Sequence, residues 1–316
     1  MKGSNTMKKF LTASLITLVS LLVVCIVLYN VAVMIYSGSF NYRCTTSEDD
    51  AFSMEDFPEL TSERHTFKTM QGHTLGGYLY ESADETVEEK AVIVFAHGMG
   101  AGGQVGYMDI FNFMAQNGFY VFAYDATAND ESEGEVMGGL PQGYIDLDYA
   151  IDYAQTIGEI NELPFLLMGY SWGAMSVTNV LNYHPEVKGV VAMAGWNKSM
   201  DMIDYVGCGM VGPVAKLLLP FASVYEYVQY GDYAFSTSMK GFENSDCPVF
   251  IVHGAEDDTI PISYGLDYYK AVYENDDRFT FKTYDDRDHI VMRDADGNHD
   301  LALMAEVVEF FNNVIK

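Results

Sequence analysis

Residues 169–173 read Gly-Tyr-Ser-Trp-Gly, and their types and spacing point most directly to chemistry. They follow the short apolar run 165–168 and precede a stretch with helical spacing, which predicts a turn from a buried strand into a helix. The glycines permit a turn tight enough to lift the Ser171 hydroxyl above the strand end. Helix N–H groups there favour developing negative charge, so we predict that Ser171 is a nucleophile. The alternative is a serine that only caps the helix.

Short apolar runs and helical stretches alternate through most of the chain. Runs of this length, apolar throughout, are typical of strands buried in a parallel sheet. An antiparallel hairpin at 65–81 precedes them. We therefore predict an α/β fold with a mostly parallel central sheet and helices on both faces. The expected strands are 91–96, 120–124, 165–168, 190–194, 249–252 and 279–284, and the expected helices are 104–117, 144–157, 174–183, 262–273 and 301–315.

Residues 196–245 interrupt this alternation. They are rich in Met, Tyr, Phe and Gly, include two prolines and show no strand pattern. We predict a helical cap over the site, and the alternative is a packed helical subdomain that does not touch substrate.

These motifs resemble the α/β-hydrolase superfamily, of the kind that includes serine aminopeptidase-like and Bem46-like enzymes, over about residues 64–316. The resemblance implies an α/β-hydrolase fold with a nucleophile, an acid and a histidine in that chain order. Residues 253–257 read His-Gly-Ala-Glu-Asp after an expected strand, and they match the family's acid loop with Asp257 as the acid. Asp258 and Glu256 are the neighbouring carboxylates that compete for this role.

The resemblance also implies that His289 is the base. It lies in the loop after strand 279–284 and 32 residues beyond Asp257, whereas the rival His299 stands at the start of the last helix. A serine needs a base to take its proton, and a neutral imidazole can do so near neutral pH. The expected cycle is attack by Ser171, an acyl-enzyme, and hydrolysis by water activated through His289.

Two backbone N–H groups complete the site that the resemblance implies. They belong to Met99, in the loop after strand 91–96, and to Trp172, directly after the nucleophile. Each such donor to the oxyanion is worth about 3–4 kcal/mol. His97 is expected to shape this loop. The loop after strand 120–124 lacks the family's Arg-Gly-His-Gly, and its Asp125 is expected to be a structural, hydrogen-bonded carboxylate.

The N-terminal region carries a separate signal. Residues 10–36 form a run of 27 residues without a charge, long enough to cross a bilayer, and we predict an uncleaved transmembrane signal-anchor there. Lysines before the run place residues 1–9 in the cytoplasm and the catalytic domain outside the cell membrane. An acidic linker, 37–60, and the hydrolase domain, 61–316, follow. If the signal were cleaved, the protein would be secreted.

The composition limits the partners. A net charge of −28 argues against nucleic acid or an anionic membrane surface as the partner of the folded part. A hydrophobic content of 49% supports a sizeable core. The sequence contains no metal-ligand, phosphate-loop or dinucleotide motif, so we expect no cofactor and no metal. Pairing among Cys44, Cys208 and Cys247 stays open, as does the oligomeric state.

Three functions stay open at this level. The leading one is a membrane-anchored serine hydrolase that cleaves a carboxylic ester, thioester or small amide in a small-molecule acyl substrate. The second is an aminopeptidase that releases residues from short peptides, because the acidic body suits a substrate ammonium. The third is a non-catalytic binding protein that has kept the fold.

Overall fold

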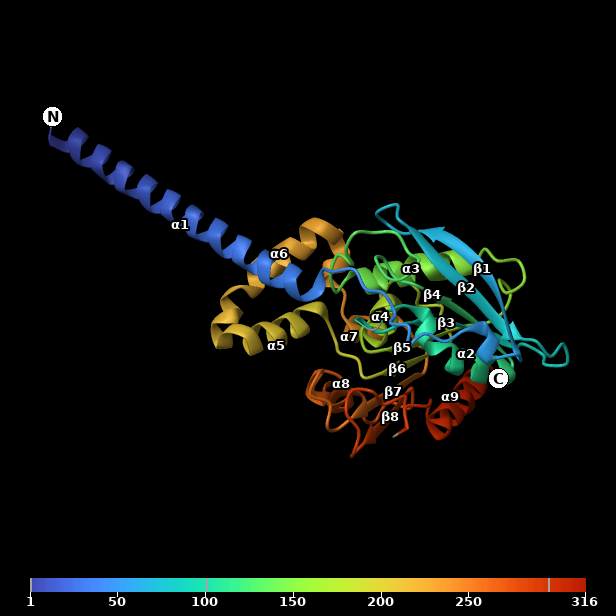
Figure 1. Cartoon of the computed structure of the whole chain (residues 1–316). Coiled ribbons are helices and arrows are strands. Elements are labelled where there is room, and N and C mark those ends of the chain that lie inside the picture. Colours follow the sequence, from blue (N-terminus) through green and yellow to red (C-terminus); the bar gives the residue numbers. More distant parts are fainter. Residues whose placement is uncertain (1, 101, 295) are drawn as a thin grey trace.

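A long N-terminal helix projects from an α/β body in the computed structural model, which describes residues 2–100, 102–294 and 296–316 (Figure 1). The body is built on one eight-stranded sheet with the order β1-β2-β4-β3-β5-β6-β7-β8. β1 pairs antiparallel with β2, β2 pairs antiparallel with β4, and every other pairing is parallel. The strands are β1 (Leu60–Lys68), β2 (Thr74–Ser82), β3 (Ala91–Ala96), β4 (Phe119–Tyr124), β5 (Phe165–Tyr170), β6 (Gly189–Met193), β7 (Val249–Gly254) and β8 (Phe279–Tyr284).

The central strands are apolar throughout because both of their faces are covered. β3, β4, β6 and β7 are buried along their whole length, whereas the edge strand β8 has no buried residue. One face packs against α2 (Met108–Gln116) and α9 (Leu301–Val314). The other packs against α3 (Gln142–Ala154), α4 (Trp172–Asn179) and α8 (Leu266–Tyr273). The expected mostly parallel sheet with helices on both faces is confirmed.

Two of the expected helices begin later than their apolar spacing indicates. The stretch from residue 104 starts as the 3-10 helix η2 (Gln104–Tyr107), and the stretch from 262 starts as η6 (Ile262–Tyr264). Gly265 follows η6 with φ −123° and ψ −103°, a backbone conformation outside the helical region, so α8 begins only at Leu266.

All regular elements within residues 196–245 are helices. They are α5 (Ser199–Val211), η4 (Gly212–Leu217), α6 (Leu219–Tyr230), η5 (Gly231–Phe235) and α7 (Ser238–Asn244). α7 packs against the body. Its Gly241 lies so close to the Thr178 carbonyl of α4 that a Cβ at this position would collide with it. α5, η4 and α6 project from the body beside the N-terminal helix (Figure 1), and we call these three elements the cap.

The N-terminal helix α1 (Lys2–Phe40) continues four residues beyond the expected end of the membrane span. Most of its length stands free, but Ala32, Tyr36 and Phe40 are buried. Their spacing of four residues puts them on one side of the helix, which packs against α5 and α6. The last turns of α1 are therefore part of the folded body.

The segment after α1, expected as an acidic linker, is bound to the body over its first residues. Arg43 donates to the carbonyls of Asp130, Ser132 and Gly134 at 2.6–3.1 Å. The backbone N–H and the hydroxyl of Thr46 both donate to the Asp130 carboxylate, at 2.6 and 2.5 Å. This part of the segment is fixed in place and does not act as a free tether.

Candidate active site

Ser171 occupies the turn between β5 and α4 with φ 56° and ψ −116°, a backbone conformation that L-residues rarely adopt. Such a conformation costs about 1–3 kcal/mol and persists only where the surroundings fix it. The Ser171 N–H donates to the carbonyl of Met193 on β6 at 2.8 Å, and the Ser171 carbonyl accepts from the Met175 N–H at 3.0 Å. The neighbouring strand and the following helix together hold the turn.

The two glycines of the motif are required by close backbone approach. A Cβ at Gly173 would collide with the carbonyl of Ala96 at the end of β3, and a Cβ at Gly169 would collide with the carbonyl of Gly173. The helix α4 can therefore start directly over the ends of the central strands, which presents the Ser171 side chain at the carboxyl edge of the sheet.

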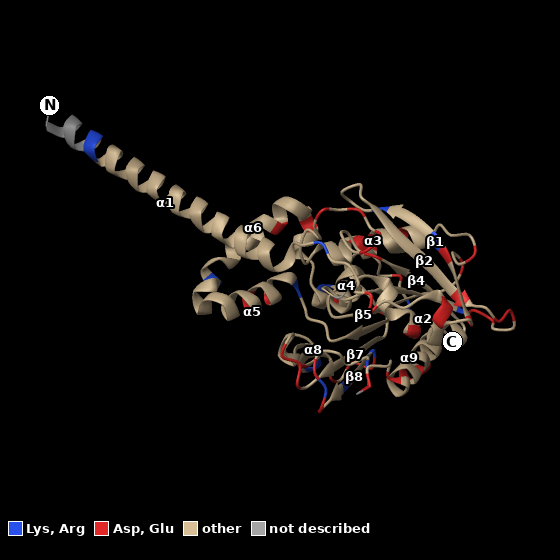
Figure 2. Ribbon diagram, viewed as in Figure 1, with Lys and Arg blue, Asp and Glu red and all other residues tan. Residues whose placement is uncertain are grey.

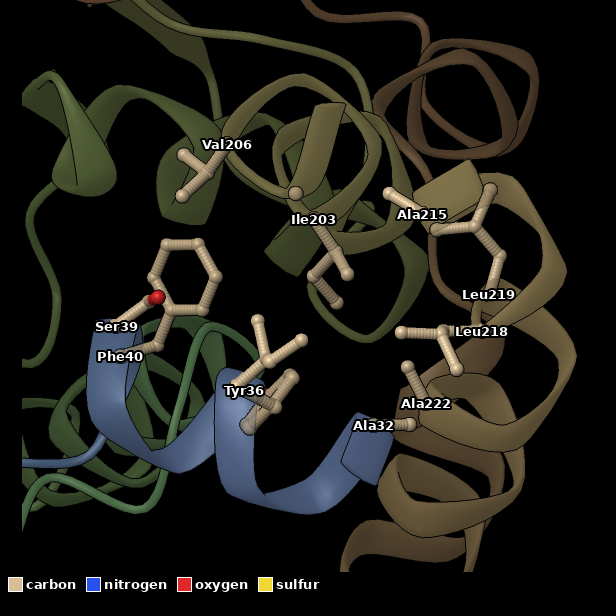
Figure 3. Close-up of a pocket in the computed structure, with 12 residues that line it drawn as sticks. Ala32, Tyr36, Ser39, Phe40, Ile203, Val206, Ala215, Leu218, Leu219 and Ala222 are labelled. Atoms are coloured by element: carbon tan, nitrogen blue, oxygen red, sulfur yellow. The ribbon is translucent and has the colours of Figure 1, made fainter. Parts of the chain in front are cut away.

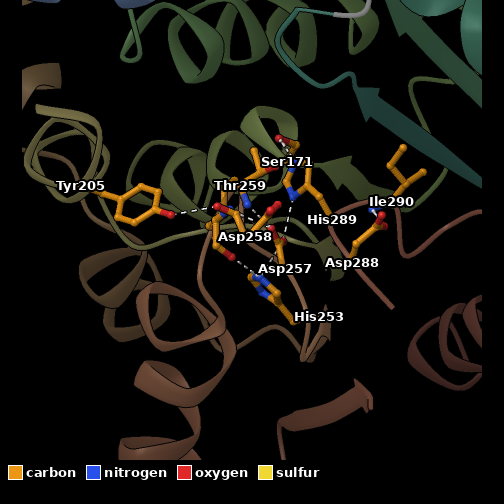
Figure 4. A network of polar contacts seen from close by, with 10 residues as sticks. Ser171, Tyr205, His253, Asp257, Asp258, Thr259, Asp288, His289 and Ile290 are labelled. Atoms are coloured by element: carbon orange, nitrogen blue, oxygen red, sulfur yellow. Dashed lines mark hydrogen bonds and ion pairs between the residues drawn. The ribbon is translucent and has the colours of Figure 1, made fainter. Parts of the chain in front are cut away.

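Three side chains meet at this edge, from three loops far apart in the sequence (Figure 4). The Nε2 of His289 lies 2.8 Å from the Oγ of Ser171. The Nδ1 of His289 lies 2.8 Å from the Oδ2 of Asp257. A carboxylate only accepts, so Nδ1 carries the proton and Nε2 is left to accept from the serine hydroxyl. The structure thus brings together the three residues that the sequence singled out.

Asp257 is held ionised although its side chain is fully buried. Burial acts to raise its pKa, but hydrogen bonds from His253, His289 and the Ile260 N–H outweigh that effect and hold the pKa well below its usual range. The N–H groups of Thr259 and Ile260 both donate to Oδ1, at 3.0 and 2.7 Å. The carboxylate is therefore fixed in orientation and charged at neutral pH.

Comparisons with known proteins agree on the fold around this site. The family model described as serine aminopeptidase, S33, matches residues 87–229. An esterase from Pyrococcus furiosus superposes with a TM-score of 0.61 at 16% identity, over 84% of this chain and 95% of that one. The chain therefore has the α/β-hydrolase fold. A carboxyl esterase from Bacillus coagulans superposes with a TM-score of 0.57 at 15% identity, over 81% of this chain and 99% of that one.

The acylaminoacyl peptidase of Pyrococcus horikoshii has the same fold in one part of its chain. It superposes with a TM-score of 0.63 at 15% identity, over 83% of this hydrolase but only 42% of the peptidase. No curated protein matches the chain significantly. The family model and the neighbours support the enzyme class predicted from the sequence, a serine hydrolase.

The proposed oxyanion donors of the hydrolase lie on either side of the serine. Trp172 is the first residue of α4, so its N–H has no partner within the helix. Met99 follows Gly98 in the loop after β3, and this loop is so close to the serine that a Cβ on Gly98 would lie 3.4 Å from the Ser171 Cβ. The assignment of these two N–H groups to the oxyanion stays a prediction.

His253 is a further contact of the acid that sequence reasoning did not single out. Its side chain is fully buried, and its Nε2 lies 3.1 Å from the Oδ2 of Asp257 and 2.9 Å from the carbonyl of Ile260. Both partners only accept, so Nε2 carries the proton. The signal in the sequence is the spacing of four residues to Asp257 within the acid loop.

The rival residues lie elsewhere. Glu256 and Asp258 are exposed, and the carbonyl of Asp258 accepts a hydrogen bond from the Tyr205 hydroxyl at 2.8 Å. The Nδ1 of His299 lies 3.3 Å from the Oδ2 of Asp109, away from the serine contacts. All four cysteines are free in the part of the chain that the structure describes, so the pairing left open by the sequence is not made.

The two other motif residues shape the loops under the site. His97 is buried and accepts from the Ala126 N–H through Nε2 at 3.0 Å, so its Nδ1 is the nitrogen that donates to the Gly98 carbonyl at 2.8 Å. Asp125 is buried, accepts from the Gln104 N–H at 2.8 Å, and has its pKa raised by burial to about 7. Both act on backbone geometry, as expected from the sequence.

Proposed function

We propose that this protein is a membrane-anchored serine hydrolase that cleaves a carboxylic ester, thioester or small amide through an acyl-enzyme on Ser171. The observation that carries the proposal is the continuous chain of two 2.8 Å contacts from Ser171 through His289 to Asp257. Geometry of this kind is what nucleophilic serine catalysis requires, whatever the substrate.

The reaction follows from the protonation states at the site. As the Oγ of Ser171 bonds to the acyl carbon, the Nε2 of His289 takes the hydroxyl proton and the carbonyl oxygen becomes an oxyanion. The N–H groups of Met99 and Trp172 stabilise that oxyanion. The C–O, C–S or C–N bond then breaks, and His289 returns the proton to the departing group. Water repeats the sequence on the acyl-enzyme and releases the acid.

Asp257 supports each proton transfer without changing its own protonation state. Its charge stabilises the imidazolium that forms on His289, and its hydrogen bond to Nδ1 keeps Nε2 free to accept. The low pKa of this carboxyl keeps it ionised across the pH range in which an imidazole exchanges protons.

Peptidase activity is the second candidate, and exposed carboxylates beside the site favour it. Glu256, Asp258 and Asp288 are exposed next to the acid or the base, where they would attract the ammonium group of a peptide N-terminus. The family model is named for a serine aminopeptidase. Aminoacyl naphthylamides compared with short-chain esters of matched acyl size separate the two activities.

The membrane anchor rests on α1. Residues Met7–Phe40 of α1 have the length and composition to cross a bilayer. Its large apolar side chains from Phe10 to Val27 are mostly more than half exposed, which is costly in water and favourable in lipid. Lysines before the span favour a cytoplasmic N-terminus and a hydrolase body outside the cell membrane.

The test is fluorophosphonate labelling of intact cells with a probe that does not cross membranes. We expect Ser171 to be the modified residue by mass spectrometry, and Ser171→Ala to abolish both labelling and p-nitrophenyl ester hydrolysis. Ser62→Ala, on the exposed side of β1, is the matched control and should retain both. A folded, unlabelled wild-type protein in permeabilised cells would instead support the non-catalytic binding protein.

A further inference from the structure

We propose that the outer end of the cap is a lipid-binding surface that lies in the outer interface of the bilayer that α1 crosses. This inference rests on the proposed membrane anchor and adds a second, peripheral contact between the hydrolase and lipid. We call this surface the cap tip. It consists of Met210, Val211, Val214, Leu217, Val224, Tyr227 and Val228.

The cap tip exposes more apolar surface than a water-facing helix pair requires. Each of its seven side chains is between 45% and 66% exposed. The three elements that carry these side chains contact one another. Apolar surface gathered on adjoining elements marks a contact with protein or membrane, whereas single exposed apolar residues do not. Taken together, the two helical segments on either side of Leu218, bent by 96°, are long and apolar enough to enter a membrane.

The charge distribution favours lipid as the occupant. Residues 205–225 contain no acidic residue and only one basic residue, Lys216, in a chain with 45 acidic residues (Figure 2). Lys216 pairs with Asp204 at 3.4 Å, and a long lysine side chain is tolerated at a membrane interface because its ammonium reaches the headgroups. A strongly acidic surface would be repelled by anionic lipid, and the cap tip avoids that repulsion.

The position of the cap along α1 places the cap tip at the depth of the outer lipid headgroups. From Lys9, the last charge before the span, to Ala32 the helix rises by about 35 Å. The hydrocarbon core is about 30 Å thick, so Ala32 lies in the outer headgroup region when the core begins directly after Lys9. Ala32 faces Leu218 and Ala222 across a narrow crevice between α1 and the cap (Figure 3). The cap tip is therefore level with the interface.

The order of side chains along the cap agrees with this depth. The members of the cap tip from Met210 to Val224 are all non-aromatic. Aromatic residues follow where the chain returns to the body, with Tyr227 and Phe235 half-exposed and their ring centroids 5.4 Å apart. Aromatic side chains are enriched at the headgroup level of membrane proteins, with aliphatic side chains on the lipid side of them.

Tryptophan fluorescence in lipid nanodiscs tests the inference on the full chain. The native Trp172 and Trp196 are buried, so their emission is subtracted as a constant background. Three single variants report on three places: Leu217→Trp on the cap tip, Val19→Trp in the proposed span, and Val272→Trp on α8 in the body. The replaced side chains are 65%, 50% and 59% exposed, so the substitutions leave the core intact.

The nanodiscs hold one copy of the protein and phosphatidylcholine brominated near the glycerol end of its acyl chains. We expect brominated lipid to quench the added emission of Leu217→Trp and to leave that of Val272→Trp unchanged. Equal emission of Leu217→Trp in brominated and normal lipid, with Val19→Trp quenched by mid-chain bromine, would overturn the cap inference and leave the anchor standing. If Val19→Trp is not quenched either, the anchor itself fails.

Acrylamide, a quencher in water, separates lipid from protein as the cover of the cap tip. Shielding of Leu217→Trp from acrylamide together with quenching by bromine supports lipid contact. Shielding without bromine quenching, seen only when a disc holds two copies, would show that a second copy of the chain covers the tip, and it would overturn the inference.

Discussion

Asp257 and Glu226 are both buried carboxylates, one in the active site and one at the junction between α1 and the cap, and their pKa values shift in opposite directions. Asp257 accepts from two histidines and two backbone N–H groups, which lower its pKa. Among the described residues, Glu226 accepts only from the hydroxyls of Tyr36 and Ser199, and burial raises its pKa to about 7. The number and kind of donors, not burial alone, decide whether a buried carboxylate is ionised.

The difference corresponds to two different tasks. The site around Asp257 keeps a permanent negative charge opposite an imidazole that must become positive during the reaction. The cluster around Glu226 joins two segments 190 residues apart in the sequence, and its second oxygen has no hydrogen-bond partner among the described residues. Substitution of Asp257 should therefore change mainly activity, and substitution of Glu226 should change mainly stability.

The largest expected effect is that of Asp257→Asn on activity. An asparagine amide can donate to Nδ1 of His289, which would put the proton on Nε2 and block acceptance from Ser171. We expect kcat for p-nitrophenyl ester hydrolysis to fall by about 10⁴-fold with little change in thermal stability. Asp258→Asn, at the exposed neighbour, is the matched control and should retain most activity. A loss of less than tenfold in Asp257→Asn would contradict the role given to the acid.

Tyr36→Ala should have the largest effect on the junction. Tyr36 is 1% exposed, donates to the Oε1 of Glu226 at 2.7 Å, and covers Gly139. Removing a buried aromatic side chain costs about 3–5 kcal/mol of unfolding free energy. We expect a lower melting temperature and faster proteolysis in the cap, measured in detergent.

Tyr36→Phe separates the two contributions of that side chain. It keeps the ring and removes only the hydroxyl, so the loss should be about 1–3 kcal/mol. If Tyr36→Ala and Tyr36→Phe both had the melting temperature of wild type, the junction would have no role in stability.

The contrast between the two regions also explains what the sequence could predict. The turn at Ser171 depends on Gly169 and Gly173, which lie within two residues of it, so a local pattern carries its geometry. The junction depends on Tyr36 meeting Glu226, and no spacing within either segment records that contact. The same limit applies to residues 37–60, which the sequence predicts as a linker. Arg43 and Thr46 bind partners near residue 130, and no pattern within 37–60 records those distant contacts.

The contact of His253 with Asp257 depends on a side-chain orientation, which a sequence pattern does not record. It stands on β7 four residues before Asp257, and only the course of the chain after the strand turns its ring toward the Oδ2 of that carboxylate. The sequence places His253 four residues before Asp257, but that spacing alone does not show that the ring faces the carboxylate.

Glu226→Gln should change how stability depends on pH. The pKa of Glu226 is raised from 4.5 to about 7, so between these values the folded protein keeps a proton that the unfolded chain releases. The contribution of Glu226 to the free energy of unfolding is therefore largest below about pH 4.5, and it is lost as the pH rises to 7. We expect the unfolding free energy of wild type to drop relative to Glu226→Gln by about 1–3 kcal/mol between pH 5 and 8.

The comparison with wild type isolates Glu226 from other buried acids. Asp125 also has its pKa raised to about 7 and contributes the same pH trend to both proteins, so it cancels in the difference. Parallel stability curves for wild type and Glu226→Gln would mean that Glu226 does not change its protonation state on folding.

The smallest expected effect is that of His253→Leu, and it sharpens the comparison from the side of the active site. Losing the Nε2–H donor removes one of the contacts that hold the Asp257 pKa low, so that pKa rises. Asp257 then takes up a proton at a higher pH than in wild type, and activity is lost earlier as pH falls. We expect kcat/KM to drop about tenfold near neutral pH, a difference of about 1.4 kcal/mol, and to drop further in acid.

His299→Ala, which removes a histidine that contacts Asp109 instead, should leave the pH profile unchanged. A uniform loss at all pH values in His253→Leu would indicate a packing defect and not a change in the charge of the acid.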